Sequence, residues 1–184
     1  MNRIMLVDDE KNILNALRRV LMGGVEIEGE SVELSVEIFD SPSDALRRAE
    51  VAAFDLVISD YRMPEMGGVE FLKAFRKIQP NAARMVLSGY ADFAGLMEAI
   101  NEAEIYRFIS KPWNDYDLKF AISQALSFRK LLMENQRLAD IVRMQQGQLS
   151  KQELALRRLE EESPGITKVN WGADGSVIID ENDV

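Results

Sequence analysis

Polar side chains stand at the carboxyl ends of short apolar stretches in this sequence. They are Asp8 and Asp9 after RIMLV, Asp60 after FDLVIS, Ser88 after ARMVL, and Lys111 after IYRFIS. Three carboxylates that are crowded together repel one another unless a cation joins them. Mg²⁺ prefers oxygen ligands, and a lysine adds a second positive charge on a flexible stem. If the fold brings these ends together, the sequence predicts a divalent-cation site beside a lysine.

Such a group of side chains is suited to phosphoryl transfer. A carboxylate can act as the nucleophile and form an aspartyl phosphate. The metal and Lys111 would neutralise charge on the transferring phosphoryl oxygens, and Ser88 could donate a hydrogen bond to one of them. We therefore expect a pocket that is acidic when empty and attracts a phosphoryl group once metal is bound.

The elements that must position these side chains are alternating strands and helices. Strands are expected at RIMLVDD, LSVEIFD, FDLVISD, ARMVLSG and IYRFIS, and an amphipathic helical pattern follows each of them. Ser41 is the expected cap of the second helix, with Pro42 at its first position. Five strands that alternate with helices imply a parallel sheet covered on both faces, with ligands bound at the carboxyl ends of the strands.

Composition excludes several other classes of function. The 184 residues contain no histidine, which excludes a histidine-ligated zinc site, a histidine general base and a phosphohistidine in this chain. A net charge of −9 disfavours direct binding to nucleic acid. No apolar stretch reaches the roughly 18 residues that a membrane span needs. The absence of cysteine suits a cytoplasmic protein.

Four motifs over residues 1–128 resemble the receiver domain of two-component response regulators. In order, they are LVDDE, DLVISDYRMPEMGG, MVLSGYAD and RFISKP. The resemblance implies an α/β, flavodoxin-like fold whose five-stranded parallel sheet has the strand order 2-1-3-4-5. The stretch YRFISKPW also resembles receivers that are attached to phosphodiesterase or phosphatase outputs. Gly67 departs from the family pattern, which more often has an aspartate there.

The resemblance implies a role for each site residue. Asp60 matches the phosphoacceptor, which takes its phosphoryl group from the phosphohistidine of a sensor histidine kinase or phosphotransfer protein. The implied Mg²⁺ ligands are Asp8, Asp9, Asp60 and the backbone carbonyl of Arg62.

The remaining matches concern phosphate contact and switching. Lys111 matches the phosphate-contacting lysine, and its bond to Pro112 is implied to be cis. Ser88 matches the switch hydroxyl, and Phe108 matches the switch aromatic that turns inward when that hydroxyl moves toward phosphate.

Residues 129–162 predict a coiled-coil helix that continues the last helix of the receiver. The heptad d positions are Leu131, Leu138, Gln145, Gln152 and Leu159, and the a positions are Asn135, Val142, Leu149 and Leu156. Asn135 at an a position favours a two-stranded parallel dimer. The alternative is a single amphipathic helix that folds back on the receiver. Residues 163–184 predict a C-terminal β-hairpin around the turn Gly-Ala-Asp-Gly.

The expected function is that of a response regulator, phosphorylated with Mg²⁺ by a partner histidine kinase. Phosphorylation would switch a dimeric coiled coil that signals to an unidentified output protein. The alternative is a phosphorelay intermediate or phosphate sink, whose phosphoryl turnover is itself the function. Any enzymatic activity would be limited to autophosphorylation from small donors and autodephosphorylation. An inert pseudo-receiver is disfavoured because no pocket residue is missing.

Overall fold

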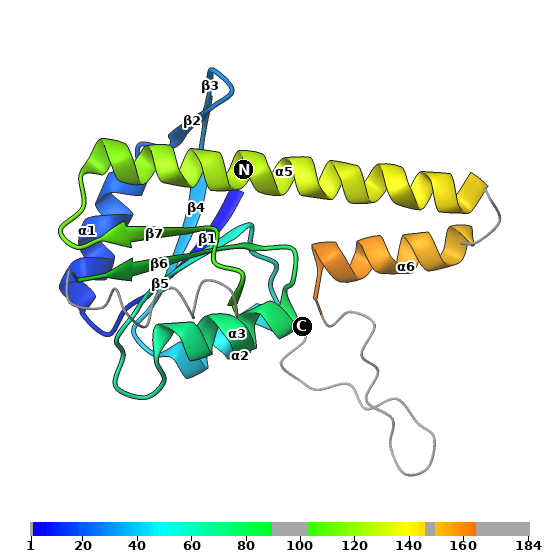
Figure 1. Cartoon of the computed structure of the whole chain (residues 1–184). Coiled ribbons are helices and arrows are strands. Elements are labelled where there is room, and N and C mark those ends of the chain that lie inside the picture. Colours follow the sequence, from blue (N-terminus) through cyan, green and yellow to red (C-terminus); the bar gives the residue numbers. More distant parts are fainter. Residues whose placement is uncertain (1, 90–102, 146–149, 165–184) are drawn as a thin grey trace, which may run out of the picture.

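A five-stranded parallel sheet forms the centre of the molecule (Figure 1). The computed structural model describes residues 2–89, 103–145 and 150–164. The strands of the sheet are β1 (Asn2–Val7), β4 (Leu34–Phe39), β5 (Leu56–Asp60), β6 (Ala83–Ser88) and β7 (Arg107–Ser110). Their order is β4-β1-β5-β6-β7 and every neighbouring pair is parallel. The predicted order 2-1-3-4-5 and the flavodoxin-like fold are therefore confirmed.

Helices cover both faces of this sheet. They are α1 (Lys11–Leu21), α2 (Pro42–Ala49), α3 (Gly68–Ile78) and the first half of α5 (Asp115–Gln145). Ser41 caps α2 by accepting a hydrogen bond from the amide of Asp44, and Pro42 occupies its first turn, as predicted. The helix expected at DFAGLMEAINEAE falls almost entirely outside the described residues.

The sheet divides the core into two layers because side chains alternate along each strand. In β1, Met5 and Val7 face a cluster that contains Phe71 and Phe75 of α3. Ile4 and Leu6 face the opposite cluster, which contains Leu118 and Ile122 of α5 together with residues of α1. All four of these β1 side chains are buried, so the strand that precedes Asp8 is fixed on both faces.

A small antiparallel hairpin between α1 and β4 was not anticipated by the sequence analysis. Its strands are β2 (Val25–Ile27) and β3 (Glu30–Val32). Glu28 and Gly29 form the turn with positive φ angles of 54° and 84°. The hairpin projects beside α5 (Figure 1). Lys130 of α5 forms an ion pair of 2.9 Å with Glu28 there.

In this structure, residues 129–162 do not form the one continuous helix that the sequence analysis predicts. Helix α5 ends at Gln145, and a separate helix, α6 (Lys151–Glu162), runs back alongside it toward the sheet (Figure 1). The local cause is a capping box, in which Ser150 and Glu153 satisfy each other's backbone amides. The chain thus folds back on the receiver, as in the alternative interpretation, but as a second helix.

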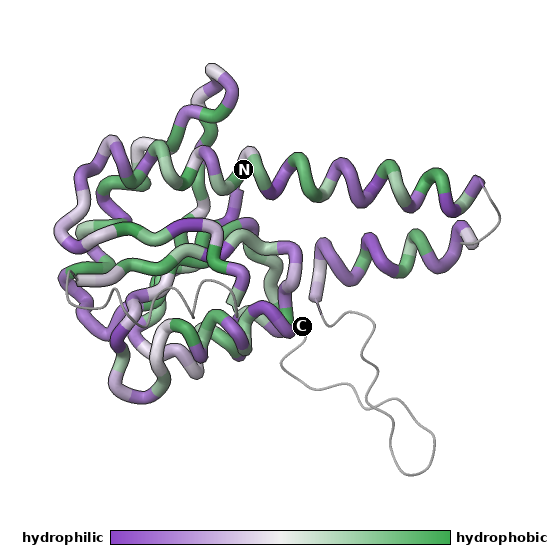
Figure 2. Tube along the Cα trace, in the orientation of Figure 1, coloured by the Kyte–Doolittle hydropathy of each residue, from purple (hydrophilic) through white to green (hydrophobic). Residues whose placement is uncertain are grey.

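Beyond the sheet, hydrophobic and hydrophilic residues alternate along α5 (Figure 2). None of the helices in the described part of the chain is long and apolar enough to cross a membrane. Leu149 and nearly all of the predicted C-terminal hairpin lie outside the described residues, as does Tyr90 of the motif MVLSGYAD.

Candidate functional site

The ammonium group of Lys111 lies between two carboxylates at the carboxyl edge of the sheet. Its Nζ is 2.7 Å from Oδ2 of Asp8, and it also forms an ion pair with Oδ1 of Asp60. Asp8 directly follows β1, Asp60 ends β5, and Lys111 directly follows β7. Three strands therefore bring together three side chains that the sequence analysis assigned to one site.

The second oxygen of each carboxylate is held by backbone. Oδ1 of Asp8 accepts a hydrogen bond of 2.9 Å from the amide of Glu10. Oδ2 of Asp60 accepts one of 2.7 Å from the amide of Arg62. Each carboxylate is thus oriented by the turn that follows its own strand, which leaves the other oxygen directed at Lys111.

Burial shapes the charges of this pocket. Asp8 is only 1% exposed, and burial raises its pKa although hydrogen bonds from Lys111 and the Glu10 amide oppose that rise. Burial also disfavours the charged form of Lys111, but hydrogen bonds to Asp60 and Asp8 outweigh it, so the pKa of Lys111 is raised. Lys111 therefore stays positively charged at neutral pH, where it offsets part of the carboxylate charge.

Strand pairing places Ser88 beside this group. Ser88 ends β6, is 1% exposed, and pairs in register with Ser110. Its backbone carbonyl accepts a hydrogen bond of 2.7 Å from the amide of Lys111. Its hydroxyl donates a bond of 3.2 Å to the carbonyl of Gly89. The hydroxyl is thus fixed one strand away from Asp60, at the same edge of the sheet.

The expected switch aromatic lies two strands away from Asp60 in the sheet order. Phe108 in β7 is half-buried and packs against the core cluster that contains Phe71 and Phe75. The peptide bond between Lys111 and Pro112 is cis, as the resemblance implied.

A glycine that the sequence analysis did not single out is required by the geometry of the site. A β-carbon on Gly68, the first residue of α3, would stand 1.8 Å from the backbone carbonyl oxygen of Asp60. Real β-carbon contacts essentially never fall below 3.0 Å. The pair Gly67–Gly68 in EMGG was the available signal, since glycine is used where two backbones approach closely.

The predicted metal ligands are only partly assembled. Oxygens of Asp8 and Asp60 converge, and carboxylate oxygens of this kind suit a hard cation such as Mg²⁺. The side chain of Asp9 is exposed. Among the described residues, no group of three or more acidic side chains is placed to hold a metal ion. The donor chemistry thus fits Mg²⁺, with Lys111 now bridging the two inner carboxylates.

Comparison with curated proteins places these residues in a known context. The hydrogenase transcriptional regulatory protein HoxA of Bradyrhizobium diazoefficiens is 33% identical over 148 residues, which are 80% of this chain and 29% of that protein. The cyclic di-GMP phosphodiesterase response regulator RpfG of Xanthomonas campestris pv. campestris is 32% identical over 128 residues, 69% of this chain and 32% of that protein. The chain therefore spans about a third or less of the length of these relatives.

A solved structure and a family model also match this chain. The signal receiver domain of an HD domain-containing protein from Pseudomonas fluorescens Pf-5 is 32% identical, with a TM-score of 0.63 over 70% of this chain and 97% of that chain. The model of the response regulator receiver domain matches residues 4–123, a range that contains Asp8, Asp60, Ser88 and Lys111. Through this match, the chain belongs to the response regulator receiver domain family.

Proposed function

We propose that this chain is a Mg²⁺-dependent phosphoacceptor, with Asp60 as the residue that is phosphorylated. The observation that carries the proposal is the bridging of Asp8 and Asp60 by Lys111 at the carboxyl edge of the sheet. It would act in the cytoplasm. Its partner would be a sensor histidine kinase or phosphotransfer protein, because receiver domains of this family receive phosphoryl groups from such proteins.

In the proposed reaction, Oδ1 of Asp60 attacks the phosphorus atom of the partner's phosphohistidine. An O–P bond forms, the P–N bond breaks, and the imidazole leaves with the electron pair of that bond and takes up a proton. The amide of Arg62 keeps Oδ2 of Asp60 in place, so that Oδ1 is the oxygen that reacts. Lys111 then exchanges its contact with Oδ1 for a phosphoryl oxygen, which conserves its charge pairing.

The remaining site residues complete this proposal. Asp8, Asp9, Asp60 and the carbonyl of Arg62 would hold Mg²⁺, which when bound neutralises charge on the transferring group. Ser88 would donate a hydrogen bond to a phosphoryl oxygen. Phe108 would turn inward when the Ser88 hydroxyl moves toward the phosphoryl group. This is a two-state rearrangement.

The output would be a dimer that pairs along α5. Leu131, Leu138 and Val142 are 60%, 52% and 49% exposed, as is expected of a surface that a second copy covers. These three side chains occupy heptad positions on one side of α5, which we call the α5 stripe. Phosphorylation would change the packing of α5, since α5 follows Lys111 by only a few residues.

The test is phosphorylation by a small phosphodonor in the presence of Mg²⁺. We expect one acid-stable, base-labile phosphoryl group per chain, lost in Asp60→Asn and on removal of Mg²⁺ by a chelator. Asp40→Asn is the matched control, because Asp40 immediately follows β4 and its carboxylate pairs instead with Lys11. Phosphorylation that persists in Asp60→Asn, or that ignores the chelator, would refute the assignment.

A further inference from the structure

Helix α6 contacts the rest of the molecule through polar side chains. Nη1 of Arg157 lies 3.0 Å from Oδ1 of Asp140 on α5, and Nδ2 of Asn81 donates a bond of 3.3 Å to Oε1 of Glu161. Within α6, all of whose residues are described, none is buried. Apolar burial therefore contributes little to holding α6 in this position.

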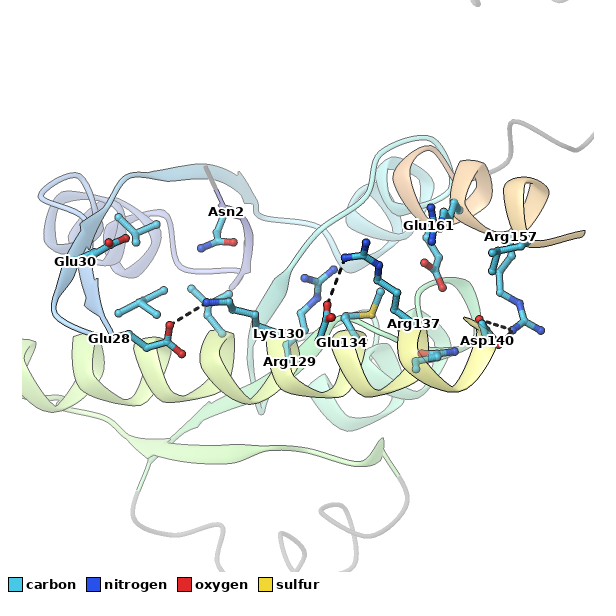
Figure 3. Close-up of a pocket in the computed structure, with 17 residues that line it drawn as sticks. Asn2, Glu28, Glu30, Arg129, Lys130, Glu134, Arg137, Asp140, Arg157 and Glu161 are labelled. Carbon is cyan, nitrogen blue, oxygen red and sulfur yellow. Dashed lines mark hydrogen bonds and ion pairs between the residues drawn. The ribbon is translucent and has the colours of Figure 1, made fainter. Parts of the chain in front are cut away.

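The contact also buries charge. Asp140 is 3% exposed and is paired with Arg143 and with Arg157. Figure 3 shows the pair with Arg157. A cavity of about 490 Å³, lined largely by charged side chains, remains between α5, α6 and the β2–β3 hairpin. A buried ion pair gains little net stability, because removing its charges from water offsets most of their attraction. The docked position of α6 is thus held by specific pairing rather than by a packed core.

Two of the three leucines of α6, Leu156 and Leu159, are directed away from this contact, whereas Leu154 is half-buried and lines the cavity. Leu156 and Leu159 are 56% and 49% exposed. At 3.6 residues per turn they lie about 140–160° around the helix from Glu161, which is bonded to Asn81. An amphipathic helix at rest normally buries its apolar side and exposes its charges. Here Leu156 and Leu159 lie on the exposed side instead, and no described residue of this chain buries them.

Two local signals in the sequence compete over the same residues. The capping box of Ser150 and Glu153 favours a new helix that starts at Lys151. The heptad pattern instead places Leu156 and Leu159 in line with Leu138 and Val142, which requires one continuous helix. In the docked arrangement, the α5 stripe of Leu131, Leu138 and Val142 lies about 160–180° around the helix axis from Asp140. The leucines of the two helices therefore cannot form one surface.

We propose that α6 is a reversible latch on the dimer surface, an inference that rests on the proposed dimer. In the closed state α6 is docked on Asp140 and Asn81, and only the α5 part of the stripe is available. In the open state α6 leaves these contacts and extends α5. A second copy of this chain then covers Leu156 and Leu159 as well, in a longer seam.

The closed and open states differ strongly in the distance between Glu161 and Arg129. In the closed state Glu161 contacts Asn81, whose carbonyl accepts a bond of 3.1 Å from Nε of Arg129. In a continuous helix, Glu161 would lie about 48 Å along the axis from Arg129, at 1.5 Å per residue. Spin labels on cysteines introduced at Lys77 and Glu162 report this change, and the absence of native cysteine leaves no competing label site.

The experiment measures this label distance by pulsed electron spin resonance in the full, unphosphorylated chain, diluted with unlabelled protein. We expect Asp140→Asn and Arg157→Gln each to raise the long-distance population at least threefold. Arg158→Gln, which removes the same charge from the neighbouring position, should leave the distribution unchanged, and Arg157→Lys should retain the short distance. Unchanged distributions in both Asp140→Asn and Arg157→Gln would overturn the latch.

Sedimentation of the same variants tests the seam. Arg157→Gln should tighten dimerisation at least fivefold, and adding Leu159→Asp should remove that gain. An open α6 without tighter dimerisation would overturn the assignment of Leu156 and Leu159 to the seam. Because neither measurement uses a phosphodonor, failure of Asp60 phosphorylation would leave the latch result intact.

Discussion

Gly68 and Asp60 are packed backbone against backbone: a β-carbon on Gly68 would lie 1.8 Å from the carbonyl oxygen of Asp60. The first turn of α3 therefore rests on the end of β5, and it does so next to the carboxylate proposed to be phosphorylated. The amide of Gly68 also donates a hydrogen bond of 2.9 Å to the carbonyl of Tyr61. The position of Asp60 thus depends on a glycine eight residues later.

Gly68→Ala should lower the free energy of unfolding by about 2–3 kcal/mol, because backbone must shift to admit the methyl group. It should also slow phosphorylation at least tenfold. Gly67→Ala is the matched control, since its nearest neighbour would stand at 4.0 Å, and it should stay within about 0.5 kcal/mol of wild type. Chemical denaturation measures both variants, and equal losses would contradict the close-approach argument.

Lys111→Met should destabilise the metal-free protein by about 2–3 kcal/mol at neutral pH. The reason is that the buried Asp8 and the neighbouring Asp60 lose the cation that separates their charges. Added Mg²⁺ should restore part of this loss by binding only the folded state. Lys77→Met, at an exposed position on α3, should show neither effect. A Lys111→Met variant as stable as wild type without Mg²⁺ would argue against the bridge.

Asp9→Ala should weaken Mg²⁺ binding at least tenfold, because a carboxylate ligand is removed from the proposed metal site. It should leave the metal-free protein at least as stable as wild type, since like charges that share a pocket destabilise each other. Calorimetric titration with MgCl₂ measures the affinity. An unchanged affinity would place the ion away from Asp9.

Glu37 on β4 should make stability depend on pH in the acid range. A hydrogen bond from Arg48, aided by Arg3, holds the pKa of Glu37 below its ordinary value of 4.5. Because the folded-state pKa is the lower one, this stabilisation is complete above the unfolded-state value and is lost as pH falls through the folded-state pKa. Glu37→Gln should therefore lower the unfolding free energy by about 0.5–1 kcal/mol at pH 7, after screening is allowed for.

The difference between wild type and Glu37→Gln should shrink steadily below about pH 4.5. Glu33→Gln, at an exposed position before the same strand, provides the control. A difference that grows toward acid pH would reverse the expected sign and refute the role of the Arg48 pair.

Leu138→Asp should weaken dimerisation at least tenfold without lowering the stability of the monomer, because Leu138 is 52% exposed in the single chain. The introduced charge would become buried in the seam. Val51→Asp replaces another exposed apolar residue, 64% exposed and outside α5, and should not affect association. Light scattering over a concentration series distinguishes these outcomes, and a wild-type chain that stays monomeric at tens of micromolar would exclude the dimer.

The sheet and the placement of Asp8, Asp60, Ser88 and Lys111 were predictable because each signal is local and repeated. Each strand of the parallel sheet contains apolar residues and has a polar residue at its end or directly after it, and parallel strands must bring their ends to one edge. The hairpin at Glu28 and Gly29 was missed because its strands have only three residues each, too few for a period-two pattern to stand out.

The break between α5 and α6 has a different origin. The heptad pattern from Leu131 to Leu159 favours one continuous helix, whereas the capping box of Ser150 and Glu153 starts a new one. Gly68 was overlooked for another reason. The glycine pair in EMGG signals that two backbones approach closely there, but the sequence does not identify the end of β5, eight residues earlier, as the partner.

Helix α5 has the geometry of a lever. Its 31 residues extend about 46 Å from Asp115 to Gln145, and only its first part is anchored in the core. A tilt of about 5° at the anchored end would displace the free end by about 4 Å at that rise per residue. A movement at Lys111 too small to alter the sheet would therefore become, at Gln145, a displacement close to the width of one side chain.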